Sequence, residues 1–201
     1  MNTNSQAGQD IFVLKTLKEK QNGTFVEIGS CDPIIINNTY LLENEYKWRG
    51  IMIEYDDKYL SSYKEHRPNS YHLIKDATTI NYNKLFQDAN MPLNIDYLQI
   101  DLEVSNRSTL TVLEKLNSEV MCTYKFATVT FEHDIYCGNH YNTRTLSREI
   151  FENRGYVRVF SDVSNGGNAF EDWYVHPELV DMTNIIKRED SMEWKDIVKI
   201  I

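Results

Sequence analysis

The stretch that most constrains the fold runs from Gly23 to Asp32 and reads GTFVEIGSCD. Its apolar, β-branched and aromatic residues lead into an acid, a glycine and turn-forming residues. Such a run is typical of a parallel strand that is buried on both faces. A glycine just after the strand lets the backbone turn sharply and lets a ligand come close. The stretch therefore predicts a buried strand that brings its carboxyl end to a ligand.

A second run of the same kind, Gly50 to Glu54, also ends in an acid, and Glu54 lies 27 residues after Glu27. This is about the spacing of one strand–helix–strand unit, and a carboxylate at the second strand end can accept hydrogen bonds from ribose hydroxyls. Gly29 is the only glycine between Glu27 and Gly50, so the glycine-rich fingerprint of an NAD site is missing. An acid before a single glycine suits a cationic ligand such as S-adenosylmethionine. The alternative is an ordinary strand pair with incidental acids.

Composition limits the class of protein and its partners. The chain has 201 residues, which favours a single domain over residues 1–201 with one sizeable core. A formal net charge of -9 disfavours a nucleic-acid partner, because phosphate binding needs a basic face. The three cysteines are widely spaced without a C-x-x-C pattern, as in reduced intracellular proteins. No apolar run approaches the length of a membrane span, so we expect a cytoplasmic protein without a membrane partner.

The rest of the chain predicts strands that alternate with helices. Further strands are expected at 71–75, 95–100 and 126–131, and helices at 5–20, 40–46, 58–65, 85–90, 108–116 and 145–153. Two more β-rich runs, 156–163 and 169–175, flank a glycine- and asparagine-rich turn and predict an antiparallel hairpin. The order predicts a doubly wound α/β sheet. The charged tail from Asp181 onward gives no clear assignment.

Acids stand at the carboxyl ends of all the expected parallel strands: Glu27, Glu54, Asp76, Asp101 and Glu132. Such acids repel one another unless cations or hydrogen-bond donors lie between them. Asp101, Glu132 and His133 could hold a hard metal, because carboxylates suit Mg²⁺ or Mn²⁺ and imidazole tolerates Mn²⁺. Glu103 and Asp134 are spare ligands or general bases. The alternatives are that Asp101 and Glu103 cap the next helix and that His133 is a hydrogen-bonded loop residue.

Several segments together resemble the FkbM-type class I methyltransferases. They are Ser5-Gln6-x-x-Gln9-Asp10, Gly23–Gly29, Asn37-Asn38-Thr39, Trp48–Glu54, Tyr97–Glu103 and Phe170-Glu171-Asp172-Trp173-Tyr174. The match spans nearly the whole chain, and the ordered combination is more specific than any single piece.

The resemblance implies a Rossmann-like, seven-stranded, mostly parallel doubly wound sheet with a C-terminal antiparallel hairpin. It also implies S-adenosylmethionine as the methyl donor. On this basis Glu54 would hold the ribose, and Asp76 with Ala77 the adenine edge. The residues expected beside the methionine part are Glu27, Gly29 and Ser30, with Gln6 and Asn38 as helpers. Related sugar O-methyltransferases carry a divalent metal on acids after strands four and five, where Asp101, Glu132 and His133 stand here.

The leading hypothesis is an S-adenosylmethionine-dependent O-methyltransferase that acts on a sugar hydroxyl, such as one on a deoxyhexose in a glycan. A metal, Mg²⁺ or Mn²⁺, would lower the pKa of the attacking hydroxyl. A base would take its proton, and Glu103, His133 and Asp134 are the candidates. The side chains expected to shape the acceptor pocket are Tyr136, Tyr141, Arg144 and Trp173. Fusion to, or cooperation with, glycosyltransferase domains is compatible with this hypothesis, and the oligomeric state is open.

Two rival functions belong to other classes. The first is a nucleotide-dependent oxidoreductase on the same kind of sheet, which the missing glycine cradle disfavours. The second is a non-catalytic module that keeps a methyltransferase fold for binding. Asp101, Glu132 and His133 are all present as candidates for chemistry, which disfavours the second rival.

Overall fold

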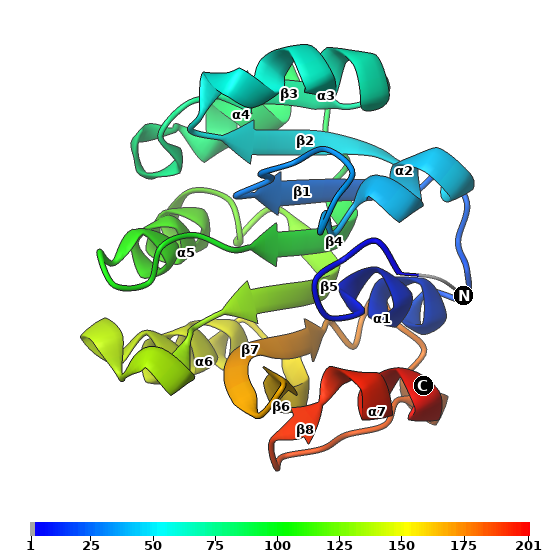
Figure 1. The fold of residues 1–201 in the computed structure, drawn as a ribbon, viewed down its shortest axis with the longest axis vertical. Coiled ribbons are helices and arrows are strands. Elements are labelled where there is room, and N and C mark those ends of the chain that lie inside the picture. Colours follow the sequence, from blue (N-terminus) through cyan, green and yellow to red (C-terminus); the bar gives the residue numbers. More distant parts are fainter. Residues whose placement is uncertain (1–2) are drawn as a thin grey trace.

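The computed structural model describes residues 3–201, and within them eight strands form one sheet in the order β3-β2-β1-β4-β5-β7-β6-β8 (Figure 1). β1, β2, β3, β4 and β5 are parallel, whereas β7 runs antiparallel between β5 and β6. The mostly parallel sheet with an antiparallel C-terminal hairpin is therefore confirmed, and β8 adds a short strand to the seven expected. The strands are β1 Thr24–Ile28, β2 Arg49–Glu54, β3 Tyr71–Ile74, β4 Asn94–Ile100, β5 Lys125–Glu132, β6 Val157–Asn165, β7 Asn168–Val175 and β8 Met192–Glu193.

Helices cover both faces of the sheet. The residues of α4, α5 and α6 pack into one apolar cluster, and those of α1, α2, α3 and α7 pack into a second cluster on the opposite face. This is the doubly wound arrangement that alternating strands and helices predict. The helices are α1 Gln9–Thr16, α2 Tyr40–Tyr46, α3 Leu60–His66, α4 Tyr82–Asp88, α5 Ser108–Glu119, α6 Thr143–Asn153 and α7 Trp194–Ile200.

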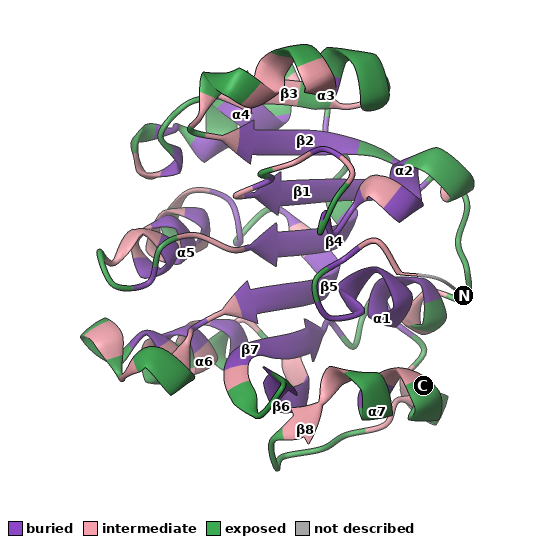
Figure 2. Ribbon diagram, in the orientation of Figure 1, coloured by how far each residue is buried: buried purple, intermediate pink, exposed green. Residues whose placement is uncertain are grey.

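The central strands are apolar because both of their faces are covered. Val26 pairs in register with Ile51 on one side and Leu98 on the other, and Leu98 pairs with Val129. These side chains belong to the cluster under α4, α5 and α6, whereas Phe25 belongs to the opposite cluster. Figure 2 shows β1, β4 and β5 almost wholly buried. Each such side chain stabilises the fold by about 1.5–3 kcal/mol through removal from water.

The first helix is shorter than the sequence predicts, because the residues before it form hydrogen bonds with the Asp10 side chain instead of helical ones. The Asp10 side chain accepts hydrogen bonds from Thr3 Oγ1 at 2.6 Å, from the Asn4 amide at 2.8 Å and from Ser5 Oγ at 2.8 Å. It therefore folds the preceding segment over the helix start instead of extending the helix back to Ser5. Gly23 does not end the helix, and a Cβ there would lie 2.4 Å from the Trp48 ring.

The C-terminal tail packs beside the hairpin. The Glu193 carboxylate accepts hydrogen bonds from the Gly166 and Gly167 amides at 3.1 and 2.6 Å and from Ser164 Oγ at 3.0 Å. β8 is thereby fixed to the turn between β6 and β7, and Ile197 of α7 is fully buried. In residues 3–201, no helix has both the length and the apolar character that a membrane span requires.

Ile36 gives the first testable prediction, because it is strained without being packed. It has a φ of 55°, which is unfavourable for a β-branched residue, and it is 62% exposed. We expect Ile36→Asn to raise the free energy of unfolding by about 1 kcal/mol, since asparagine tolerates the left-handed region. Urea denaturation measures this. Ile35→Asn is the control, because Ile35 is 68% exposed but has no left-handed φ; an equal gain there would contradict the strain argument.

Candidate functional site

The carboxyl ends of β1, β2, β4 and β5 meet at one edge of the sheet, on the left in Figure 1. Two adjoining cavities lie there, with volumes of about 390 and 670 Å³, in the range of small-molecule sites. Gly29, Glu54, Leu102 and Glu103 line both cavities, so we treat the two as parts of one site. Its place is the one that an open parallel sheet predicts.

Gly29 makes the junction between β1 and β4 possible. Its φ is 88°, and a Cβ at this position would lie 1.8 Å from the backbone oxygen of Asp101. The Asp101 amide in turn donates a hydrogen bond to the Ile28 carbonyl at 3.0 Å. Only glycine lets these two strand ends come so close. The predicted need for a glycine after the first strand is therefore explained by a contact with the fourth.

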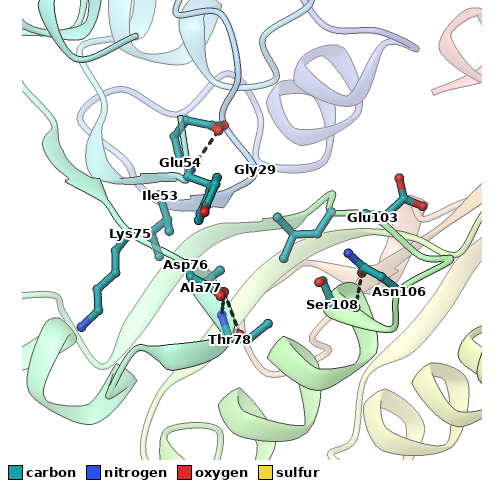
Figure 3. A pocket seen from close by; sticks show the side chains of 12 residues that line it. Gly29, Ile53, Glu54, Lys75, Asp76, Ala77, Thr78, Glu103, Asn106 and Ser108 are labelled. Carbon is teal, nitrogen blue, oxygen red and sulfur yellow. Dashed lines mark hydrogen bonds between the residues drawn. The ribbon is translucent and has the colours of Figure 1, made fainter. Parts of the chain in front are cut away.

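The smaller cavity contains the predicted adenosine-binding residues (Figure 3). Asp76 Oδ1 accepts hydrogen bonds from the Thr78 amide at 2.9 Å and from Thr78 Oγ1 at 2.7 Å, which fixes the turn after β3. In Figure 3 the Lys75 side chain extends away from Glu54. The lining residues are Gly29, Ile53, Glu54, Tyr55, Lys75, Asp76, Ala77, Thr78, Leu102, Glu103, Asn106 and Ser108.

Glu54 is held in place by backbone amides. Its Oε2 accepts a hydrogen bond from the Cys31 amide at 2.8 Å, and its Oε1 accepts from the Tyr55 and Asp56 amides at 2.8 and 3.0 Å. A carboxylate offers about four acceptor positions, so one remains for a ligand beside the three in use. Glu54 thus joins the loops after β1 and β2 and still faces both cavities.

The larger cavity is acidic. It is lined by Gln6, Glu27, Gly29, Ser30, Cys31, Asp32, Ile35, Ile36, Asn38, Glu54, Asp101, Leu102, Glu103, Glu132 and Asp134, with no lysine, arginine or histidine among these described residues. Asn38 is 5% exposed, and its Oδ1 has no hydrogen-bond partner among the described residues. An unpaired buried acceptor among carboxylates favours a ligand that donates hydrogen bonds or carries positive charge.

Glu27 is a fully buried carboxyl at the end of β1. Burial raises its pKa to about 7, against the lowering influence of Arg67 and of hydrogen bonds from Thr39 and Asn37. Thr39 Oγ1 donates to Glu27 Oε2 at 3.0 Å, and Asn37 Nδ2 donates to the same oxygen at 3.3 Å. Glu27 can therefore change protonation near neutral pH, and a cationic ligand would favour its ionised form.

Asp101, Glu132 and Asp134 place three carboxyls on the wall of the larger cavity. Burial and then the Asp101 charge raise the pKa of Glu132 to about 12. Burial and then the Asp101 charge also raise the pKa of Asp134, and burial raises that of Asp101. Glu103 differs, because hydrogen bonds from Ser105 lower its pKa. A bound cation would favour the ionised forms of these acids.

His133 lies apart from this group, contrary to the predicted metal set of Asp101, Glu132 and His133. Its side chain is fully buried, with Nε2 3.4 Å from Asp162 Oδ1 and 3.6 Å from Asp172 Oδ1. The Ile135 amide donates to its Nδ1 at 3.3 Å, which places the ring proton on Nε2, towards the two acids. Successive strand residues face opposite sides, so Glu132 faces the cavity and His133 does not.

Arginines already neutralise the acids beside His133. Arg148 Nε donates to Asp172 Oδ2 at 2.6 Å, and Arg148 Nη2 donates to Asp162 Oδ1 at 3.0 Å. Although burial opposes it, bonding to Arg148 holds the pKa of Asp172 well below its usual range. Arg144 also pairs with Asp162. His133, Asp162 and Asp172 lie close enough to surround an ion, but the guanidinium of Arg148 bonds to both acids.

Two predictions for the acceptor pocket are wrong. Trp173 is fully buried, stacks on Phe12 with ring centroids 4.7 Å apart and donates from Nε1 to Glu171 at 2.7 Å. Arg144 pairs with Asp162 and lines neither cavity. Tyr136 and Tyr141 are exposed on the loop after β5 and also line neither cavity.

Several residues of the site were not predicted from the sequence. Asn106 and Ser108 line the smaller cavity, and their place just after the fourth strand is a signal that could have found them. Arg67 supports Glu27 through Thr39 and Asn37, and no local pattern indicates this.

No family model and no curated protein matches the sequence. Solved structures do match. A TehB-like SAM-dependent methyltransferase from Corynebacterium glutamicum is 8% identical, with a TM-score of 0.52 over 84% of this chain and 87% of that one. A putative rRNA-methylase from Clostridium thermocellum is 14% identical, with a TM-score of 0.54 over 87% and 97%. A putative DNA modification methyltransferase encoded within an E. coli prophage is 10% identical, with a TM-score of 0.53 over 84% and 52%. The chain therefore has the Rossmann-like fold of class I SAM-dependent methyltransferases.

Proposed function

We propose that this protein is an S-adenosylmethionine-dependent methyltransferase. One observation carries the proposal: all the residues predicted to bind the donor line the two joined cavities. Gln6, Glu27, Ser30 and Asn38 line the larger one, Asp76 and Ala77 the smaller one, and Gly29 and Glu54 both. Fold alone does not define a reaction, whereas this set of side chains indicates the donor.

The donor fits with its adenosine in the smaller cavity and its methionine part in the larger one. Glu54 faces both cavities and would accept a hydrogen bond from the ribose. Glu27 and the unpaired Asn38 Oδ1 would accept hydrogen bonds from the ammonium group. Asp101 and Glu103 then lie on the cavity wall where the methyl group would meet its acceptor.

We propose a hydroxyl of a sugar, on a glycan or a deoxyhexose, as the methyl acceptor. The acidic lining favours a neutral acceptor over a phosphorylated one, because unpaired like charges repel. The same lining disfavours nucleic acid, although two of the similar structures carry the names of rRNA and DNA methylases. Tyr136 and Tyr141, which are 52% and 54% exposed, are available to stack on a sugar ring.

A hard divalent cation, Mg²⁺ or Mn²⁺, would bind to the carboxyls of Asp101, Glu132 and Asp134 once these draw together, because among the described residues only His133, Asp162 and Asp172 already lie close enough to surround an ion. Oxygen ligands are those that such ions prefer. Burial raises the pKa of all three acids, and the Asp101 charge adds to the rise for Glu132 and Asp134. Asp134 replaces His133 in this ligand set. When bound, the ion would neutralise the acids and lower the pKa of an acceptor hydroxyl.

The chain's own residues suit the proton transfer that O-methylation needs. Asp134 and Glu103 both line the larger cavity, and a carboxylate oxygen of either that the ion leaves free would take the acceptor's hydroxyl proton. The hydroxyl oxygen would then bond to the methyl carbon as the carbon–sulfur bond breaks, leaving a methyl ether and S-adenosylhomocysteine. Holding the two reactants in line supplies much of the rate.

Calorimetric titration with S-adenosylhomocysteine tests the donor site. We expect the wild type to bind it and Glu54→Gln to bind about 10–100-fold more weakly, the loss expected for a hydrogen bond to a charged group. Glu65→Gln is the control, because Glu65 is exposed at the end of α3, and it should bind like the wild type. No binding by any of the three would overturn the proposal. Tight binding of NAD instead would favour the oxidoreductase.

A further inference from the structure

Arg67, just after α3, is a fully buried cation that neither cavity touches. Its Nε donates to Glu43 Oε2 at 2.9 Å, its Nη1 to Asn37 Oδ1 at 2.9 Å, and its Nη2 to Thr39 Oγ1 at 2.6 Å. Nη1 also donates to the Pro33 carbonyl at 3.3 Å. A buried guanidinium is costly unless its donors are paired, and these contacts pair them.

The residues that accept from Arg67 donate in turn to Glu27. Thr39 Oγ1 lies 3.0 Å and Asn37 Nδ2 lies 3.3 Å from the same oxygen, Glu27 Oε2. Asn37 Nδ2 also donates to the Ser30 carbonyl at 3.0 Å. Two parallel hydrogen-bond paths therefore connect the Arg67 guanidinium to the Glu27 carboxyl, one through the Thr39 hydroxyl and one through the Asn37 amide. We call these two paths the relay.

We propose that Arg67 is a positioning residue of the donor site, which acts through Thr39 and Asn37 to orient Glu27 and keep it ionised for the donor's ammonium group. This inference rests on the proposed function. Arg67 does not touch the donor, and it is remote from Glu27 in the sequence. Its role is to fix the loop after β1 and to supply positive charge behind the Glu27 carboxylate.

Electrostatics support this geometry. Burial raises the pKa of Glu27 to about 7, and the Arg67 charge is the largest of the influences that lower it, ahead of the Thr39 hydrogen bond. Tyr63 and Tyr97 are titratable groups that interact with Glu27, and burial raises the pKa of both, so they stay neutral. Glu54 and Asp101 line the same cavity as Glu27. Weakening the relay should therefore raise the pH at which Glu27 ionises.

The test uses Thr39 rather than Arg67, because removing Arg67 would leave Glu43 buried without its partner and could unfold the chain. Thr39→Val removes the relaying hydroxyl at nearly constant shape, and Thr39→Ser keeps it. Thr39 precedes α2 but makes no side-chain cap hydrogen bond, so neither change removes a helix cap. The affinity for S-adenosylhomocysteine is measured by calorimetry from pH 6 to pH 8.5 for the wild type and both variants.

We expect the wild type to lose affinity as pH falls through about 7, by up to about tenfold per pH unit. In Thr39→Val this loss should begin at higher pH, so that binding is about 3–10-fold weaker than wild type at pH 7 but about equal at pH 8.5. Thr39→Ser should follow the wild type. Ratios to the wild type at each pH cancel the ionisation of the ligand itself.

A purely structural role predicts something different. If Thr39→Val weakened binding equally at every pH, the relay would be refuted. The same would hold if Thr39→Ser weakened binding as much as Thr39→Val. In both cases the proposed donor site would be unaffected. If the wild type bound no S-adenosylhomocysteine at any pH, the proposed function would fall first. The two failures are therefore distinguishable.

Discussion

Gly29→Ala is expected to abolish donor binding and to destabilise the fold strongly. A Cβ at Gly29 would lie 1.8 Å from the Asp101 backbone oxygen, and the residue's φ of 88° strains any side chain. Overpacking and left-handed strain together should lower the free energy of unfolding by about 2–5 kcal/mol. Because Gly29 lines both cavities, the displaced strand ends should lower affinity for S-adenosylhomocysteine by at least about 100-fold.

Gly155→Ala separates the two causes. Gly155 has a φ of 84°, close to that of Gly29, but a Cβ there would meet no atom within 4 Å. This control should cost only the left-handed strain, about 1–2 kcal/mol in urea denaturation, and should leave the calorimetric affinity unchanged. Equal losses in the two variants would refute the close approach of β1 and β4, and normal donor binding by Gly29→Ala would refute its place in the site.

Much of this site could be predicted from the sequence because parallel strands end at one edge of the sheet. The apolar runs before Glu27, Glu54 and Asp101 marked three carboxyl ends, and the rule for open sheets placed those ends together. The helix predicted at 40–46 has the observed bounds of α2. These features depend on the periodicity of apolar residues over short stretches, which can be read directly from the sequence.

The residues that sequence reasoning missed depend on long-range packing. Arg67 lies among charged residues near Pro68 and resembles an exposed helix end, yet folding buries it against Glu43 of another helix. Trp173 was predicted to line a pocket, but α1 packs on the sheet and covers it with Phe12. No local pattern shows which distant element will cover a side chain.

His133 was misplaced for a different reason, since the information was present. The strand was expected to end at Phe131, whereas β5 continues to Glu132. Side chains alternate along a strand, so its continuation turns Glu132 to the cavity and His133 to the opposite side, towards Asp172. An error of one residue at the strand end therefore put His133 into the predicted metal set, whereas Asp134 is the residue that lines the cavity.

Glu132→Gln should stabilise the protein while it weakens binding of a divalent cation. In the free protein burial and the Asp101 charge raise the pKa of Glu132 to about 12, so the folded state holds a proton that the unfolded state releases above about pH 4.5. Folded-state stability therefore falls as pH rises from about 4.5 towards 12. Glutamine resembles the protonated acid and keeps a donor for Asp101, so it removes this dependence.

We expect a gain on the order of 2 kcal/mol for Glu132→Gln at pH 8, measured by urea denaturation without added metal, and a smaller gain at pH 5. Glu103→Gln is the control, because hydrogen bonds lower the pKa of Glu103 and loss of its charge should bring no gain. Added Mg²⁺ should raise the melting temperature of the wild type but not of Glu132→Gln, since a ligand that binds only the folded state stabilises it. If Glu132→Gln were less stable than the wild type at pH 8, the claim that Glu132 is protonated in the folded protein would be wrong. An equal rise in melting temperature with Mg²⁺ in both proteins would show that the cation does not bind at Asp101, Glu132 and Asp134.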